Sequence, residues 1–470
     1  MTEQEARAIY HQGEEAVVAK LLEFDARLMK IEAMLSLNST NSSKPPSTDN
    51  KLKRKVSAKT KSSKKRGGQV GHKGNHLKFS ATPDVIEEHY PDTCTHCQYS
   101  LDDTPSSKVE RRQLFDLPEI KMHVTEYRAH TKICPCCKGK NKAIFAEDVK
   151  SVTQYGNNLK AFISYCHSYQ MLPYERIVTF IEDLSSHKIG VGTVYNVLET
   201  HYERLDTFER QVKGALLKSK VLHSDETGVH VKDKLHWIHV TSNDNLTYYF
   251  LHQRRGSIAM DAMDILPRYQ GTLIHDHWKP YNRYNCAHGF CNAHLLRELT
   301  RVIELDNVQW SKDMHHCLTH MNTTVRQAKE HKGVSLTTDK VLHLTKRYKQ
   351  ICKGALTYYV KAPQTLPKKR GRPKQEKAKN LLDRLTLYQH ETLQFLNDFD
   401  IPFTNNLAER DLRMIKVKEK ISGTFASFHG GEIFCRIRGY ISTLKKNGIS
   451  VLEGLKNALL GNAYCPGVGV

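Results

Sequence analysis

The chain of 470 residues is 39% hydrophobic and carries a formal net charge of +21. Its length predicts about three domains rather than one, and because it has no run of about 20 apolar residues, no membrane-spanning helix is expected. Residues 51–76 hold ten Lys or Arg and no acid, and residues 361–379 hold eight basic residues and one acid. Such runs are typical of flexible phosphate-binding arms, with a pair of solvated linkers as the alternative.

The N-terminus and the cysteine content predict a cytoplasmic protein. Residues Met1–Glu5 are acidic and lack the charged-then-apolar order of a signal peptide. Twelve cysteines in a chain of this length, without a secretion signal, are typical of reduced thiols, and they favour metal binding over disulfides.

Residues 1–37 are predicted to form a coiled-coil helix. Three leucines recur every seven residues, with Phe24 and Ile31 between them: Leu21, Leu28 and Leu35. This a/d stripe over little more than two heptads favours a homo-oligomer, although a helix this short could also pack within its own chain.

Residues 38–77 are predicted to be a basic, disordered linker. A Pro/Ser-rich breaker, Asn41–Ser47, is followed by a Lys-rich run with almost nothing to bury. Within this run the candidate DNA-binding residues are Lys64, Lys65 and Arg66.

Residues 78–150 are predicted to be a zinc-binding module. Two Cys-x-x-Cys pairs separated by 36 residues can each reach one ion from a tight turn, so that together they make a tetrahedral site. The four candidate ligands are Cys94, Cys97, Cys134 and Cys137. His96 or Cys136 could replace a neighbour, and two unrelated thiol pairs are the alternative. Short alternating apolar segments between Lys108 and Ala129 predict strands.

Residues 151–215 are predicted to form a helical, helix-turn-helix-like DNA-binding domain. Amphipathic segments cover Asn157–Tyr169 and Leu172–Leu184, and a last helix follows Thr193, which is a plausible N-cap. In a helix-turn-helix the last helix would enter the major groove. Many helical linkers show the same pattern.

Residues 216–430 are predicted to form a catalytic core. Strands at 221–231, 237–240 and 247–251 are followed by a helix at 257–266, a strand at 272–274 and a helix from Asn292. This order is that of a ribonuclease-H-like α/β core. The fold class is therefore multidomain α+β, with a coiled-coil helix, a zinc-binding module and a helical DNA-binding domain before the core.

The predicted core is interrupted by a helical insertion at about 300–400 and is followed by a helical tail, 431–470. The insertion contains a compact basic run, Pro367–Pro373, in which Arg370 and Arg372 are candidate minor-groove ligands. A basic surface loop is an equally good reading of this run.

Three acidic residues far apart in the sequence are the candidate catalytic residues. Asp225 and Asp276 follow the apolar starts of two predicted strands, and Glu409 lies at the start of a predicted helix. Taken singly, each is an ordinary turn or surface residue, but two strand-borne carboxylates and one helical carboxylate can together hold two divalent ions. Arg410 and Arg413 beside Glu409 are expected to contact phosphates.

A resemblance to one family covers essentially the whole chain. The residues that carry it are Ser43–Ser47, Gly67–His72, Cys94–Cys97, Cys134–Cys137, Tyr155–Gly156, Asp225–Thr227, Asp276–Tyr281, Cys291–His294, Asn405–Arg410, Ser422–Phe425, Gly430–Glu432 and Lys446–Ile449. In these motifs and their order the chain resembles transposases of the insertion-sequence-66 family, which are DDE transposases of bacterial mobile elements.

The resemblance implies that Asp225, Asp276 and Glu409 are a metal-binding triad with two Mg²⁺ or Mn²⁺ ions as cofactors. It implies a reaction in which water cuts double-stranded DNA at the element end, and the exposed 3′-hydroxyl then attacks a target phosphodiester. Accessory proteins of the same element and association with the bacterial nucleoid are also implied. Where the family often has glycine after the second aspartate, this chain has His277.

Two other functions use the same features. One is a metal-dependent DNA nuclease or resolvase without strand transfer, and the other is a zinc-containing DNA-binding regulator with an inactive core. Cys291 and His294 are expected either to contact the site from beside it or to be ordinary residues on the core-facing side of a helix.

Overall fold

The structure, a computed structural model, describes residues 2–39, 41–42, 77–331, 333–361 and 375–465. The first basic run and residues 362–374 of the second lie outside the described residues. With them lie the predicted DNA ligands Lys64, Lys65, Arg66, Arg370 and Arg372. Within the described ranges no helix is both long and apolar enough to cross a membrane.

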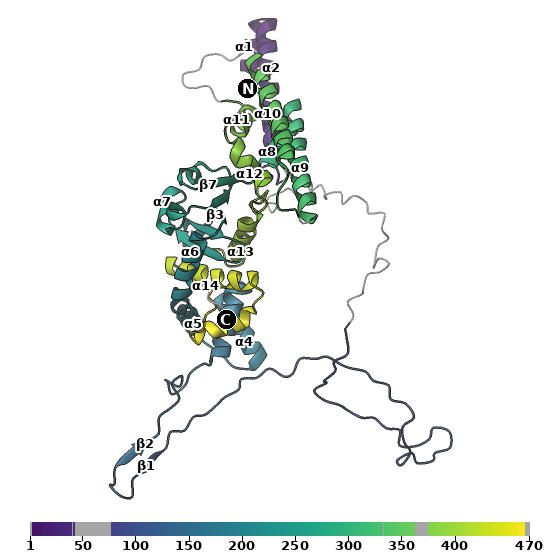
Figure 1. Cartoon of the computed structure of the whole chain (residues 1–470), viewed down its shortest axis with the longest axis vertical. Helices are drawn as coiled ribbons and strands as arrows, with labels where there is room; N and C mark the ends of the chain where they lie inside the picture. Colours follow the sequence, from purple (N-terminus) through teal and green to yellow (C-terminus); the bar gives the residue numbers. More distant parts are fainter. Residues whose placement is uncertain (1, 40, 43–76, 332, 362–374, 466–470) are drawn as a thin grey trace.

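A five-stranded mixed sheet lies at the centre of the chain (Figure 1). Its strands, in spatial order, are β5 (Thr247–His252), β4 (Lys234–Ser242), β3 (Val221–Val231), β6 (Thr272–His275) and β7 (Ala287–Phe290). β3 pairs antiparallel with β4 and parallel with β6. The first four strands were predicted from the sequence, but β7 was not.

The missed strand β7 is short and weakly apolar. Its sequence is Ala-His-Gly-Phe, which has little of the branched or aromatic content that predicts a strand. At Gly289 an added Cβ would lie 2.5 Å from Ile274 Cδ1 of the neighbouring strand β6, so a larger residue would require the Ile274 side chain to shift. Only this tertiary contact makes the segment a strand.

The two faces of the sheet carry different helices. Because side chains alternate along a strand, Val229 and Val231 point to the same face as Ile238 and Val240 of β4, where they pack with the helices α13 (Asn406–Ser422) and α14 (Phe428–Lys446). The opposite face packs on α6 (Asp206–Leu217) and α7 (Ser257–Met263). The sheet is therefore covered on both sides.

The helices before the sheet share one core with the C-terminal helix α15 (Val451–Leu459). They are α3 (Asn157–Ser164), which continues as a π-helical turn over Tyr165–Tyr169, α4 (Tyr174–Ser185), α5 (Val191–Arg204) and α6. Buried His201 of α5 joins three of these helices, with Ser164 Oγ at 2.8 Å and the Leu455 carbonyl oxygen at 3.1 Å. Domain boundaries were predicted at positions 215 and 430. Residues on both sides of each boundary contribute to this core.

One predicted helix start was wrong. The N-cap of α5 is Gly190, whose backbone is extended, and Thr193 lies in the first turn, where its amide donates to the Gly190 carbonyl at 3.0 Å. The extended backbone at Gly190 lets the helix begin three residues earlier than the hydroxyl of Thr193 suggested.

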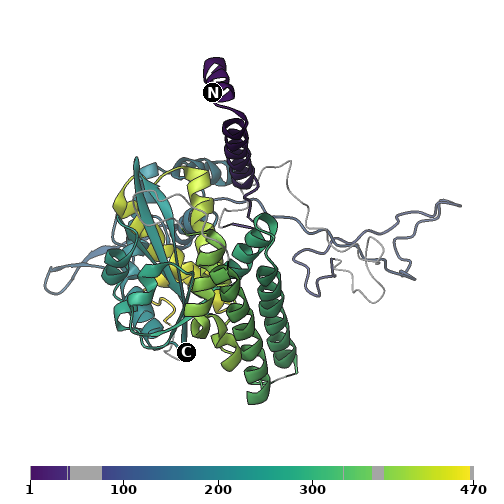
Figure 2. The same cartoon turned by 90° about the horizontal axis from the view of Figure 1, so that it is seen from above.

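Among the described residues between β7 and α13, where a helical insertion was predicted, five helices share a second hydrophobic core that also includes Ile274 of β6. They are α8 (Asn292–Leu305), α9 (Gln309–Glu330), α10 (Thr338–Lys361), α11 (Lys377–Leu387) and α12 (Gln389–Asn397). Seen from above, the long helices α9 and α10 run side by side next to the sheet (Figure 2).

The N-terminal segment is two helices rather than the single helix that was predicted. α1 (Glu3–His11) and α2 (Glu14–Leu35) are separated at Gly13, whose φ of +101° is a conformation that other residues rarely adopt. The heptad leucines of α2 are exposed. Asn41 beyond this helix donates to Glu304 of α8 at 2.7 Å, which links the N-terminal segment to the insertion.

Residues 77–150 form extended arms in which no residue is buried (Figure 1). Their regular structure is a short hairpin of β1 (Thr131–Ile133) and β2 (Lys140–Lys142). The strands predicted between Lys108 and Ala129 are not observed in this segment. The alternating apolar side chains there, such as Leu114 and Val124, are exposed and pack on no second layer that would stabilise a sheet.

Candidate active site

Asp225 and Asp276 lie level with one another on neighbouring parallel strands. The pairing of β3 with β6 runs to His223 opposite Ile274, and each aspartate is two residues further along its own strand direction. Since side chains two residues apart share a face, both carboxylates point to the face that α13 covers. The pairing of the two strands thus brings together two aspartates that are 51 residues apart in the sequence.

The charges of the two aspartates are only weakly compensated, because burial raises the pKa of Asp276 although the charge of Arg255 acts to lower it. The Asp225 Oδ1 accepts the Glu226 amide at 2.9 Å, and the Asp276 Oδ1 accepts the Trp278 amide at 2.9 Å. Burial, together with the charges of Glu226 and Asp276, raises the pKa of Asp225 well above its usual range, and burial also raises the pKa of Asp276. Among the described residues neither aspartate forms an ion pair, so the pair presents a place for a cation.

Glu409 is positioned by the buried residue Asn405 at the start of α13. The Asn405 Oδ1 lies 2.8 Å from His223 Nδ1, and its Nδ2 donates to the Ser224 carbonyl at 2.9 Å. Both contacts are to β3, directly before Asp225. The Glu409 amide donates to the Asn405 carbonyl at 3.3 Å, so the helix turn that carries Glu409 begins from this anchored residue.

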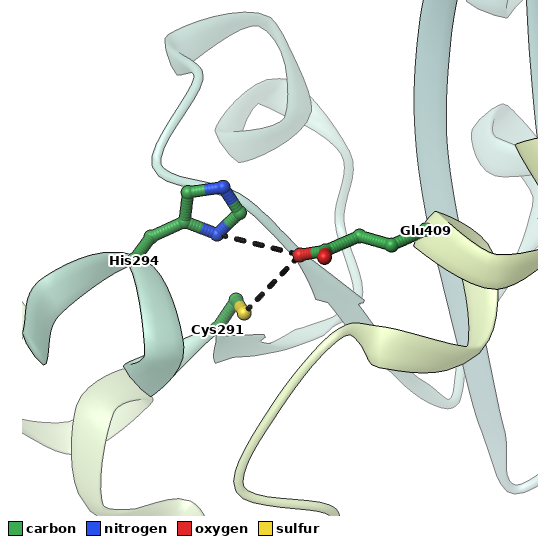
Figure 3. Close-up of side chains that lie close together, drawn as sticks. All are labelled: Cys291, His294 and Glu409. Atoms are coloured by element: carbon green, nitrogen blue, oxygen red, sulfur yellow. Dashed lines mark hydrogen bonds and ion pairs between the residues drawn. The ribbon is translucent and has the colours of Figure 1, made fainter. Parts of the chain in front are cut away.

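The Glu409 carboxylate faces α8 (Figure 3). Its Oε1 lies 3.8 Å from His294 Nδ1, 3.9 Å from the Arg297 guanidinium and 4.0 Å from Cys291 Sγ. The potential ligand atoms of Cys291, His294 and Glu409 all lie within 4.8 Å of one another. Within the described part of the chain Asp225, Asp276 and Glu409 do not form such a group, although the charge of Glu409 contributes to the raised pKa of Asp225.

Glu226, the residue after Asp225, points to the opposite face and anchors the middle of β3. Its carboxylate accepts two hydrogen bonds from Arg255, at 2.6 and 2.9 Å, and one from the Tyr281 hydroxyl at 2.5 Å. The Arg255 guanidinium lies 4.0 Å from the ring centre of Trp278 and 4.8 Å from that of Trp237. The contacts of Glu226 with Arg255 and Tyr281 were not predicted from the sequence. Strand alternation alone does place the Glu226 side chain on the opposite face from Asp225.

The two predicted zinc turns have the same backbone geometry. The Cys94 amide donates to the Tyr99 carbonyl at 2.8 Å, and the Cys134 amide donates to the Gly139 carbonyl at 2.9 Å. Backbone amides of the following residues lower the pKa of both Cys94 and Cys134, which favours the metal-binding thiolate. The structure does not bring the four predicted sulfur ligands into one cluster within 4.8 Å.

Arg410 and Arg413 are the predicted DNA ligands that the structure describes. Both are exposed on α13, the first of them next to Glu409 in the chain. Their side chains are therefore open to a ligand that approaches this helix.

Comparisons with known proteins agree with this architecture. The model of the Transposase IS66 family matches residues 152–433, more than half of the chain, and the chain belongs to this family. Residues 1–78 match a family of unknown function, DUF6444. No curated protein is similar enough to match.

Ten chains of solved structures match. One is from a "CryoEM structure of simian T-cell lymphotropic virus intasome in complex with PP2A regulatory subunit B56 gamma". It is 13% identical, the match covers 46% of this chain and 80% of that chain, and the TM-score is 0.15. So low a score carries no argument about this protein.

Proposed function

We propose that this protein is a DDE transposase that cuts double-stranded DNA at the ends of a mobile element and joins the freed 3′-hydroxyl to target DNA. The observation that carries the proposal is the level placement of Asp225 on β3 and Asp276 directly after β6, where burial raises the pKa of both carboxylates. The mixed five-stranded sheet, with α13 packed on the face that carries the aspartates, supports the proposal of a ribonuclease-H-like core. Membership of a transposase family supports the same activity.

The donor set fits divalent metal ions. Clustered carboxylates without a basic partner are stabilised by cations, and Mg²⁺ prefers carboxylate oxygens and water as ligands. Asp225, Asp276 and Glu409 are the residues that would hold two such ions. When bound, paired ions activate the attacking oxygen and stabilise the leaving oxygen in a phosphodiester displacement.

The other residues of the site hold this donor set in place. Asn405 anchors the first turn of α13 to β3, and the contacts of Glu226 with Arg255 and Tyr281 hold the middle of β3 on the opposite face. Arg410 and Arg413, exposed on α13, would hold the phosphates of the DNA near Glu409.

We assign supporting roles to the remaining segments. The turns at Cys94 and Cys134 would join around a structural Zn²⁺, because their first cysteines already favour the thiolate form. The helices α4 and α5 would contact the element ends as a helix-turn-helix, and the exposed leucines of α2 would pair with a second copy of the chain. Other proteins of the same element would assist this assembly.

A cleavage and joining assay tests the proposal. Labelled element-end DNA is incubated with Mg²⁺ and either the wild-type chain, Glu409→Gln, or Glu453→Gln, a matched change at an exposed position of α15. We expect the wild type and Glu453→Gln to cleave and join the DNA, and we expect Glu409→Gln to do neither. Undiminished cleavage by Glu409→Gln would contradict the assignment of the third carboxylate.

Pre-cut element ends separate the transposase from the nuclease alternative. A transposase joins these ends to new DNA, whereas a nuclease or resolvase cuts the intact substrate and leaves pre-cut ends unjoined. DNA binding without cleavage or joining in every protein would favour the regulator with an inactive core.

A further inference from the structure

A second set of metal-binding atoms converges on Glu409. Cys291 follows β7 directly as the N-cap of α8, and His294 lies in the first turn of that helix. Both side chains turn towards the Glu409 carboxylate of α13 (Figure 3). The Asn405 amide donates to Cys291 Sγ at 3.1 Å, so the same anchor that positions Glu409 also holds the start of α13 against this sulfur.

The spacing of the three ligand atoms is close to that of a tetrahedral zinc site. Zinc–ligand bonds of about 2.3 Å to sulfur and about 2.0–2.2 Å to nitrogen or oxygen place sulfur and oxygen ligands about 3.6 Å apart, and nitrogen and oxygen ligands about 3.4 Å apart. The observed separations from Glu409 Oε1 are 4.0 Å to Cys291 Sγ and 3.8 Å to His294 Nδ1. A contraction of about 0.4 Å would bring both of these separations to the values of a zinc site, and the ligand atoms of all three residues lie within 4.8 Å of one another.

An unsatisfied nitrogen independently points to a missing ligand. His294 Nδ1 is buried and has no hydrogen-bond partner among the described residues. Buried polar atoms are nearly always paired, and those that are not call for an explanation such as an ion. This nitrogen is the one that faces Glu409, at a distance too long for a hydrogen bond.

We propose that Cys291, His294 and Glu409 bind one Zn²⁺ ion, and that this ion represses DNA cleavage by holding Glu409 away from Asp225 and Asp276. The repression rests on the proposed function, in which Glu409 completes the Mg²⁺ site. On binding, the Cys291 thiol becomes a thiolate and releases one proton to solvent. Water fills the fourth zinc position, as it does in three-ligand sites.

The two ions compete for Glu409 because they prefer different ligands. A thiolate and an imidazole select Zn²⁺, whereas Mg²⁺ takes oxygen ligands and does not compete for Cys291. The Glu409 carboxylate already faces the zinc ligands and does not form a close group with the aspartates. Arg297, which lies 3.9 Å from the same oxygen, would keep the carboxylate in place when neither ion is bound.

Metal counting tests the site without any need for activity. The full-length chain is freed of metal, titrated with Zn²⁺, and its tightly bound equivalents are counted. Co²⁺ is then used as a probe, because cobalt bound to a thiolate gains a charge-transfer absorption. Cys291→Ser keeps an acceptor for the Asn405 amide. Cys465→Ser is the matched control, at a cysteine far along the chain whose thiol donates to the Ala463 carbonyl.

Cys291→Ser is expected to bind one equivalent fewer than the wild type, and Cys465→Ser is expected to bind the same number. His294→Asn provides a second variant with the same expectation, should the first fail to fold. An unchanged zinc count in both Cys291→Ser and His294→Asn would overturn the site. Zinc held by the turns at Cys94 and Cys134 is common to all of these proteins and cancels in the comparison.

Zinc sensitivity then tests the repression. In the Mg²⁺-dependent cleavage assay, the Zn²⁺ concentration that halves the rate is expected to rise at least about tenfold in Cys291→Ser, since even changes behind the metal ligands act on this scale. Equal inhibition of Cys291→Ser and wild type would overturn the repression. If no protein cleaves DNA under any condition, the proposed function fails, while the zinc count still decides the site.

Discussion

Asn405 and Asn406 are chemically identical neighbours in different environments, so replacing each by alanine isolates the effect of one anchor. Asn405 is buried, and its side chain contacts His223 and the Ser224 carbonyl, whereas Asn406 is exposed. Asn405→Ala leaves both partners buried and unsatisfied, at about 1–3 kcal/mol each. We therefore expect a loss of about 4 kcal/mol in the free energy of unfolding, against less than about 0.5 kcal/mol for Asn406→Ala.

Urea unfolding followed by tryptophan fluorescence measures this difference. Two of the three tryptophans, Trp237 and Trp278, flank Arg255 beside the sheet, so the signal reports on the part of the fold that Asn405 anchors. Asn405→Asp should fall between the two alanine variants, because its carboxylate accepts from His223 but cannot donate to Ser224. Equal unfolding free energies for Asn405→Ala and Asn406→Ala would refute the role of Asn405.

The same pair of variants separates positioning from stability. If Asn405→Ala remains folded, the start of α13 is expected to shift and to carry Glu409 with it, and a misplacement of about 1 Å lowers rates by about 10²-fold. Cleavage by Asn406→Ala should stay near that of the wild type. A folded Asn405→Ala with full cleavage would show that Glu409 does not depend on this anchor.

Two further predictions concern pH and salt. Burial lowers the pKa of His201 to about 4, so below its ordinary pKa of about 6.5 the unfolded chain takes up a proton that the folded chain does not, and stability falls as the pH falls. At pH 5 this loss of stability amounts to about 2 kcal/mol. The fall in unfolding free energy from pH 7 to pH 5 should therefore be smaller by that amount in His201→Gln. An unchanged fall would contradict the lowered pKa of His201. If Arg410 and Arg413 contact phosphates, each alanine variant should reduce the slope of log affinity for DNA against log salt by about one, and a slope equal to that of the wild type would place the arginine off the DNA.

Much of the architecture could be predicted because local patterns determine it. Alternating apolar residues identified β3, β4, β5 and β6, and helical periodicity identified the insertion between β7 and α13. The same reasoning failed where the stabilising partner lies elsewhere in the fold. β7 is a strand because it pairs with β6, whereas the alternating residues between Lys108 and Ala129 have no layer to pack on and form no strand.

In the candidate site, too, some features could be predicted from the sequence and others depend on the tertiary structure. The sequence by itself singled out Asp225, Asp276 and Glu409 by residue type and position, and it could place Asp225 and Glu226 on opposite faces because a strand has a period of two. Which distant groups meet is a property of the tertiary structure. The pairing of β3 with β6 sets the two aspartates level, and the contact between the starts of α13 and α8 brings Glu409 to Cys291, 118 residues away in the chain. Such contacts depend on how whole elements pack, and local sequence patterns do not contain that information.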